Sequence, residues 1–328
     1  MANTSTDRTL SGAAKTVITP PVGYPMGNWG LRQGIAKGVH RDIHARAVVF
    51  ENGGLTLSVI SLEIAGLTSE TVQAIKGRVL QLVGIPVDNI LLNFTHNHTS
   101  PDTIVSLQRE WMTWTTWLAD QVAGCVFDAA SHMVQVKVGS GLGSFENWTV
   151  NRQYPDKPID TEVGVIYVTD DEGNPVAHLV NFACHGVADG GQHLEWSGDF
   201  AGEMSADIEV RAPGSVALYV QGAAGDICPF DWWFGNNASE HLHSHEDTAL
   251  LGQALAGEAL KLTAKVTTSS KVPIGVALAP AKLPRHQVNW TVDEAIANRD
   301  HLIEVLPVYW GETWLPGTTT ANSAERHP

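Results

Sequence analysis

Short apolar runs rich in β-branched residues alternate along this chain with longer stretches of helical period, and this alternation most constrains its fold. The predicted strands are residues 13–19, 45–51, 55–62, 89–95, 133–139, 162–169, 175–183 and 215–221. The predicted helices are residues 68–83, 111–132, 199–211, 248–264 and 292–305. Strands mixed with helices in this order indicate an α/β fold, in which helices flank a mixed β-sheet.

The composition is that of a globular protein and excludes several classes of function. The chain has 328 residues, of which 43% are apolar and 17% charged, enough to bury a sizeable core. A formal net charge of −15 gives no basic surface for nucleic acid or anionic membranes, so we expect no nucleic-acid partner. No apolar run reaches the ~20 residues of a membrane span. The start of the chain shows no secretory signal, which favours a cytoplasmic location.

The pattern divides the chain at about Leu283. Residues 1–282 are predicted to form one α/β domain. Residues 283–328 contain the predicted helix 292–305, then Pro307, Pro316 and Gly317, and no closing strand. We expect them to be an incomplete or loosely structured part of the same domain, and the natural protein to continue past Pro328.

Two histidines follow a predicted buried strand, in Thr95-His96-Asn97-His98-Thr99-Ser100-Pro101. If the extended geometry persists, His96 and His98 lie on one face at the carboxyl end of the strand, where α/β sheets usually place their ligands. Neutral imidazoles there suit zinc, whereas the alternative is a pair of surface histidines in a loop. The pair alone is a weak pattern.

A third histidine, His185, ends another apolar strand in Asn181-Phe182-Ala183-Cys184-His185-Gly186. A single histidine there is more often a hydrogen-bonded core residue, but two strands that deliver histidine to the same sheet edge favour a metal. Asp199, farther along, is at the position of a helix N-cap or, alternatively, a carboxylate in the wall of the site.

A glycine-rich turn follows the strand 215–221, in Gly222-Ala223-Ala224-Gly225-Asp226-Ile227-Cys228-Pro229. It either presents backbone amides to an oxyanion or is simply a tight turn. Three roles are open for Cys228: a nucleophile, a metal ligand or an inert core thiol. His241, His243 and His245 alternate, as histidines that bind metal can, but their acidic and polar neighbours favour a solvated loop or adventitious metal binding. The run Trp232-Trp233-Phe234 walls an apolar pocket or packs in the core.

Taken together and in order, these segments resemble the catalytic domain of the neutral/alkaline ceramidase family. The matching stretches are Ile18-Thr19-Pro20-Pro21 with the glycines up to Gly30, Asp42-Ile43-His44-Ala45-Arg46-Ala47, Thr95 to Pro101, Asn151-Arg152, Cys184-His185-Gly186, Ser197 to Gly202, and Gly222 to Pro229. The resemblance covers roughly residues 16–257. It implies a zinc enzyme that hydrolyses N-acyl amides such as ceramide.

The resemblance also assigns roles by position. It implies that His96 and His185 are ligands of Zn²⁺, and that His98 and Arg152 contact the substrate carbonyl or the developing oxyanion. Asp226 and Cys228 join the candidate catalytic residues, and Cys228 stands where the ceramide hydrolases have serine. The family's remaining ligands, a glutamate and a tyrosine, have no match.

The sequence therefore predicts a zinc-dependent hydrolase of an N-acyl amide bond, with a small-molecule or lipid amide as substrate. One alternative is a catalytically incomplete family member or a fragment, since Glu304 and Tyr309 lack matching surroundings. Another is a thiol hydrolase with Cys228 as nucleophile. A metallo-β-lactamase-type site is disfavoured because Ser100 stands where an aspartate is usual, and the hairpin-rich start disfavours a barrel. The oligomeric state is not predicted.

Overall fold

The computed structural model describes residues 8–28, 34–101, 103, 109–154, 156–229, 244–282 and 291–299. Its strands are β1 (Leu10–Val17), β2 (Pro25–Met26), β3 (Gly34–Ile35), β4 (Gly38–Val39), β5 (His44–Asn52), β6 (Leu55–Leu62), β7 (Ile90–Phe94), β8 (Val134–Ser144), β9 (Thr149–Asn151), β10 (Glu162–Asp170), β11 (Pro175–Phe182), β12 (Glu195–Trp196), β13 (Val216–Gln221) and β14 (Ile227–Pro229). Its helices are α1 (Ser69–Val83), α2 (Arg109–Ser131), α3 (Asp199–Arg211) and α4 (His245–Thr263), with a 3₁₀ turn η1 (Val87–Asn89). Residues 292–299 form a further short helix, which is exposed.

Within the described residues, eight strands form one mixed sheet in the order β13-β11-β10-β8-β1-β5-β6-β7. The pairs β6–β7 and β11–β13 are parallel, and the other neighbours are antiparallel. The predicted α/β class, a mixed sheet flanked by helices, is confirmed. The division at about residue 283 stays a prediction, because most of residues 283–328 lie outside the described part of the chain.

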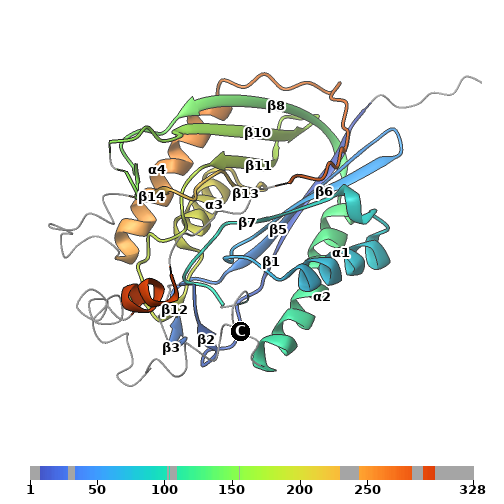
Figure 1. The fold of residues 1–328 in the computed structure, drawn as a ribbon. Coiled ribbons are helices and arrows are strands. Elements are labelled where there is room, and N and C mark those ends of the chain that lie inside the picture. Colours follow the sequence, from blue (N-terminus) through green and yellow to red (C-terminus); the bar gives the residue numbers. More distant parts are fainter. Residues whose placement is uncertain are drawn as a thin grey trace, which may run out of the picture.

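The sheet folds over on itself, so that the domain has four layers (Figure 1). Helices α1 and α2 cover the half made by β1, β5, β6 and β7, and α3 and α4 cover the half made by β8, β10, β11 and β13. The facing sheet halves enclose a third apolar core, which includes Val48, Phe50, Val168, Leu179 and Leu218. The hinge is at β8, which pairs with β1 only through Val134 and Gln135 but with β10 along its length.

Polar side chains hold the two halves together near the carboxyl ends of their parallel strands. The amide of Asn93 on β7 donates to the carbonyl of Tyr219 (3.0 Å) and accepts from the backbone N–H of Gln221 (3.1 Å). Ser61 on β6 donates to the same Tyr219 carbonyl at 2.6 Å. The segments that follow β7, β11 and β13 therefore emerge at one place.

Local sequence chemistry explains the element boundaries. The hairpin β5–β6 closes through Gly53 and Gly54, which both have positive φ (59° and 86°). A two-residue turn needs these angles to match the twist of its strands. Thr68 caps the start of α1, and Gly84 ends it with φ 84°. The short strands β2, β3, β4, β9, β12 and β14 were not predicted, since two or three residues carry no periodicity. Among the described residues, no helix combines the length and hydropathy needed to cross a bilayer.

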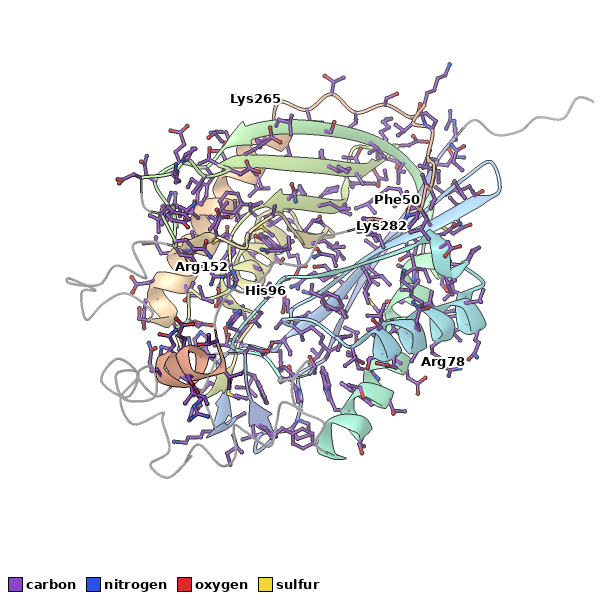
Figure 2. The ribbon with its side chains drawn as sticks, in the orientation of Figure 1. Phe50, Arg78, His96, Arg152, Lys265 and Lys282 are labelled. Carbon is purple, nitrogen blue, oxygen red and sulfur yellow. The ribbon has the colours of Figure 1, made fainter. Side chains whose placement is uncertain are left out.

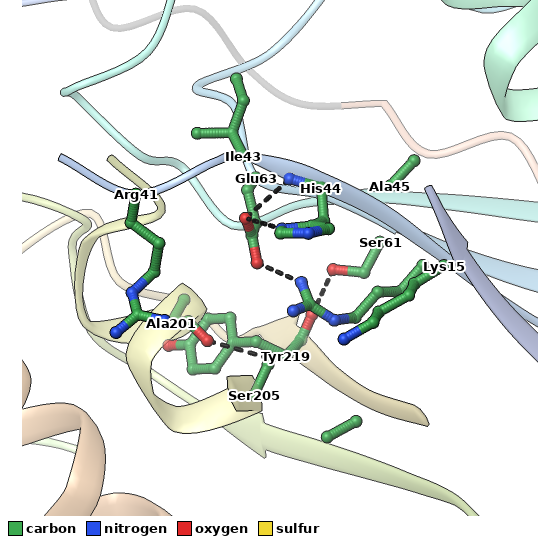
Figure 3. Close-up of polar contacts among 12 residues, drawn as sticks. Lys15, Arg41, Ile43, His44, Ala45, Ser61, Glu63, Ala201, Ser205 and Tyr219 are labelled. Carbon is green, nitrogen blue, oxygen red and sulfur yellow. Dashed lines mark hydrogen bonds and ion pairs between the residues drawn. The ribbon is translucent and has the colours of Figure 1, made fainter. Parts of the chain in front are cut away.

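A buried network of charged side chains joins β5, the residue after β6, and α3. Glu63 accepts hydrogen bonds from the Arg46 guanidinium and from the backbone N–H of His44, the latter at 2.8 Å (Figure 3). Arg46 also pairs with Glu209 at 3.0 Å. Burial disfavours the charged form of Glu63, but the Arg46 charge and the contacts with His44 together outweigh this effect and lower the pKa of Glu63.

Candidate active site

Three imidazoles converge where the segments after β7 and β11 meet. The Nε2 atoms of His96 and His185 lie 3.0 Å apart, and Nε2 of His98 lies 3.4 Å from Nε2 of His96. His185 is buried, while His96 and His98 are half-buried. The structure thus brings together the three histidines that the sequence singled out at two separate strand ends.

Their hydrogen bonds fix which ring nitrogens carry protons. Nδ1 of His96 lies 3.2 Å from the Ala65 carbonyl, and Nδ1 of His185 lies 3.0 Å from the Ala224 carbonyl. Carbonyl oxygens only accept, so both Nδ1 atoms donate and the neutral rings keep a lone pair on Nε2. Burial lowers the pKa of His185 to about 4, which keeps its ring neutral at pH 7.

Two facing lone pairs cannot hydrogen-bond to each other, but both can bind one cation. Two ligand atoms of a tetrahedral zinc ion, each ~2.0–2.1 Å from the metal, lie about 3.3 Å apart. The observed separations of 3.0 and 3.4 Å bracket that value. Each Nδ1–H donates to a backbone carbonyl, the outer hydrogen bond that usually orients a metal-bound histidine. The residues present therefore fit a zinc ion, with His98 able to supply a third nitrogen.

The backbone reaches this arrangement differently from the sequence-based expectation. Strand β7 ends at Phe94, and His96 has the left-handed φ of 59°, so the extended geometry does not persist through the motif. His98 is instead held by its backbone N–H, which donates to the Gly186 carbonyl at 2.8 Å. Asn97 and Gly186 form a parallel bridge that joins the two histidine-bearing segments directly.

Asn97, between the two histidines, is the buried anchor of the loop. Its amide donates to the Glu63 carbonyl (3.0 Å) and the Ser197 carbonyl (2.5 Å). Its Oδ1 accepts from the backbone N–H and the hydroxyl of Thr99, both at 2.8 Å. Four hydrogen bonds on one fully buried side chain fix the loop rigidly against the segment before α3.

Arg152 directly follows β9 and Asp226 directly precedes β14, beside the cluster, and the Arg152 N–H donates to the Asp226 carbonyl at 2.7 Å. The Arg152 guanidinium donates from Nε and Nη2 to the Gly225 carbonyl, at 3.0 and 2.7 Å, and its charge acts on His185. Figure 2 shows Arg152 close to His96. Asp226 is exposed, and its carboxylate accepts from the Asn151 amide at 2.9 Å. Through this contact Asp226 positions the glycine-rich turn before β14 against β9.

Cys228 has the environment of a core thiol. Its side chain is fully buried, and burial raises its pKa to about 11, an effect that the nearby Arg152 charge only partly offsets. A thiol nucleophile needs the opposite, a lowered pKa and access to substrate. Cys184 is likewise buried, and burial raises its pKa as well.

Asp199 occupies a strained, buried position rather than the predicted N-cap. Gly198 is the N-cap residue, and Asp199 is the first helical residue, with φ 53°. Its carboxylate accepts from the backbone N–H groups of Ala188, Asp189 and Phe200, at 3.3, 3.1 and 2.7 Å. Burial, followed by the charge of Asp189, raises its pKa. Asp199 thereby braces the segment after His185 and does not point into the histidine cluster.

His245 is not in a solvated loop as predicted. It is the first residue of α4, mostly buried, and its Nδ1 lies 2.9 Å from the Asp189 carboxylate. His40 and Glu195 lie beside it and complete a second group of side chains that could hold a metal. The sequence raised His245 as an adventitious metal ligand but did not connect it with His40 or Glu195. The predictions for His241, His243 and Trp232 to Phe234 fall outside the described residues.

Comparison with known proteins gives a fold but no family. No family model and no curated protein matches the chain. In fold it is similar to neutral ceramidase from Pseudomonas aeruginosa, with a TM-score of 0.68 and 19% identity over 79% of this chain and 45% of that chain. It is also similar to a ceramidase complexed with C2, with a TM-score of 0.66 and 20% identity over 79% and 44%. The chain thus has a ceramidase-like α/β fold and spans less than half the length of these two proteins.

Proposed function

We propose that this chain is a zinc-dependent hydrolase of N-acyl amides, with a ceramide-like lipid amide as substrate. The observation that carries the proposal is the approach of Nε2 of His96 to Nε2 of His185 at 3.0 Å, with Nδ1 of each ring directed at a backbone carbonyl. The fold likeness to two ceramidases supports the reaction class.

His96 and His185 would hold the metal, and His98 lies close enough to act as a third ligand or to face the substrate. Bound zinc supplies a nucleophilic water at neutral pH and polarises the amide carbonyl. The burial of His185 keeps its ring neutral, and the Nδ1 bonds of both rings hold them in their orientation before any metal arrives.

Arg152 would stabilise negative charge on the substrate. Its guanidinium is tethered to the Gly225 carbonyl, which fixes the charge beside the histidines while part of the side chain stays accessible. A positioned donor of this kind contributes ~3–4 kcal/mol to an oxyanion transition state. If His98 is not a ligand, it serves in the same way, as the resemblance implies.

The two alternatives differ in their support. The thiol hydrolase is disfavoured, because Cys228 is buried and its pKa is raised. The catalytically incomplete protein has one specific point in its favour: among the described residues, the candidate cluster of His96, His98 and His185 contains no carboxylate.

The test combines zinc content with hydrolysis of a panel of substrates. The untagged full chain is analysed for zinc and assayed on N-acylsphingosines, on N-acyl amino acids and on an ester analogue. The variants are His96→Ala and Arg152→Ala, and the matched controls are His132→Ala and Arg78→Ala, which change exposed residues far from the site in sequence.

We expect hydrolysis of N-acylsphingosines that is lost in His96→Ala together with zinc, and is reduced about 10²–10³-fold in Arg152→Ala with zinc retained. Neither control should change. If the wild-type chain binds zinc and His96→Ala loses it, but the wild type hydrolyses none of the amides, the proposed activity is contradicted. Absence of zinc from a folded chain would contradict the site itself.

A further inference from the structure

A second cluster of metal-ligating side chains lies outside the His96 site. His40 follows β4, Glu195 belongs to β12, and His245 begins α4, and one ligand atom of each lies within 4.8 Å of the others. Nε2 of His245 is 3.2 Å from Oε2 of Glu195. His40 is exposed and its ring stacks on that of His245, with centroids 3.6 Å apart and an interplanar angle of 5°. The lone pair of an imidazole lies in the ring plane, so the His40 ring must turn out of this stack for both rings to bind one ion.

The backbone holds two of these residues in register. Strands β4 and β12 pair in parallel, with Gly38 opposite Glu195, and the N–H of His40 donates to the Trp196 carbonyl at 2.9 Å. A Cβ on Gly38 would lie 3.1 Å from Oε1 of Glu195, so glycine leaves room for the carboxylate beside the strand. The side chains of His40 and Glu195 thus start from a fixed framework.

Asp189 orients the third residue. Its fully buried carboxylate accepts the Nδ1–H of His245 at 2.9 Å, which turns Nε2 toward Glu195. A carboxylate on the far nitrogen of a histidine is the outer-shell arrangement found behind metal-bound imidazoles. The mostly buried position of His245 makes this orientation rigid.

The donor set indicates the kind of ion. Two imidazoles and one carboxylate suit zinc or a similar transition metal, whereas calcium and magnesium prefer oxygen ligands. The 3.2 Å between the His245 and Glu195 ligand atoms matches the ~3.3 Å edge of a tetrahedral zinc site. The positive end of the α4 dipole opposes a cation, but Asp189, Glu195 and the first-turn residues Glu246 and Asp247 offset it.

We propose that His40, Glu195 and His245 form a second site for a divalent transition-metal ion, with Asp189 as its positioning residue. This site does not depend on the proposed function, because it shares no ligand with the histidine cluster of the candidate active site.

The second site is connected to that cluster through Asp189. The other oxygen of Asp189 lies 3.3 Å from the Thr99 hydroxyl, which lies 2.8 Å from Oδ1 of Asn97. Asn97 separates His96 from His98. An ion at the second site therefore fixes β4, β12 and α4 together and supports the loop that carries the first site.

The same contacts have a metal-free explanation, a protonated His245 that bridges two carboxylates. The two differ in what the protein binds. A bridging imidazolium takes up a proton and no metal, whereas the proposed site takes up one equivalent of zinc.

The test is a zinc count on the full untagged chain after equilibration with zinc and desalting. The ligand variants are His40→Ala, Glu195→Gln and His245→Ala, and His96→Ala reports on the other site. His132→Ala is the matched histidine control. The double variant His241→Ala/His243→Ala tests adventitious binding by neighbouring histidines. Circular dichroism confirms that each variant is folded.

We expect each ligand variant to bind one equivalent less than the wild-type chain, and His132→Ala and the double variant to match the wild type. Asp189→Asn should weaken this equivalent about 10–100-fold, since it removes no ligand of the ion but weakens the hydrogen bond that orients His245. If the first site fails, His96→Ala matches the wild type while the loss in His245→Ala remains. A count unchanged in folded His245→Ala, or lowered only in the double variant, would overturn the proposal.

Discussion

Gly186 lies directly against the backbone of Asn97. A Cβ on Gly186 would lie 2.9 Å from Cα of Asn97 and 2.6 Å from the carbonyl oxygen of His96. Two histidine-bearing segments approach this closely only because one of them has no side chain at the crossing point. The distance between His96 and His185 therefore depends on a glycine that itself binds nothing.

Gly186→Ala is expected to separate the two segments. The new methyl group meets backbone atoms that cannot rotate away, so the variant should lose ~1–3 kcal/mol of stability and bind zinc more weakly than the wild type. Thermal denaturation and a zinc titration measure the two effects. Gly77→Ala is the control, since a Cβ there meets open space. Unchanged zinc affinity in Gly186→Ala would show that the contact does not set the histidine spacing.

Backbone strain at His96 gives a second prediction. A φ of 59° costs an alanine about 1 kcal/mol but costs glycine nothing. His96→Gly should therefore be about 1 kcal/mol more stable than His96→Ala in urea denaturation of metal-free protein, although both lose the same equivalent of zinc. Equal stabilities would mean that the loop relaxes to an ordinary conformation once the imidazole is removed.

The buried network behind the site gives a third prediction. Arg46 pairs with both Glu63 and Glu209, and all three are buried or nearly so. Arg46→Met leaves the buried Glu63 without its guanidinium and Glu209 with only the half-exposed Lys15, and should cost ~3–5 kcal/mol. Arg78→Met breaks the exposed pair with Asp120 and should change stability by less than about 1 kcal/mol. Similar losses in both variants would contradict the distinction between buried and exposed pairs.

Thiol chemistry tests the environment of Cys228. All three cysteines are buried, and burial raises the pKa of Cys228 to about 11. Iodoacetamide at pH 7.5 should leave Cys228 unmodified in the native protein and modify it after denaturation, as mass spectrometry of peptides would show. Rapid native labelling of Cys228 with loss of amide hydrolysis would instead favour the thiol enzyme.

Much of the fold could be predicted because its elements are long enough to show a period. Strands such as Leu55–Leu62 and helices such as Ser69–Val83 have clear patterns and turn or cap residues at their ends. The folding of the sheet onto itself could not be predicted, because it depends on contacts such as Asn93 with Tyr219, 126 residues apart. Such pairings leave no local signal.

The candidate site divides in the same way. His96 and His185 could be proposed because each follows a recognisable strand. His40, Glu195 and His245 come from three distant segments, and two of the strands that align them, β4 and β12, are two residues long. No local pattern therefore connects His245 with His40 or Glu195, and a solvated loop was the interpretation that its neighbours favoured.

The pH dependence of stability follows from a histidine far from either site. His178 on β11 is buried, its Nδ1 lies 2.7 Å from the Ser215 hydroxyl, and its ring contacts Tyr167 on β10. Burial lowers its pKa to about 4 from an unfolded value of 6.5. Between these values the unfolded chain binds more protons, so stability is full above pH 6.5 and falls as the pH drops toward 4.

The size of this effect is at most about 3.4 kcal/mol, from the two pKa values and 1.36 kcal/mol per unit. His178→Asn keeps a polar group near Ser215 but cannot be protonated. Urea denaturation at pH 7 and pH 4.5 measures the stability of both proteins. Between these pH values the wild type should lose more stability than His178→Asn, by up to that amount. Groups such as Glu63 and His185 titrate in both proteins, so their contributions cancel in the comparison. Parallel stability curves over this range would mean that folding does not lower the pKa of His178.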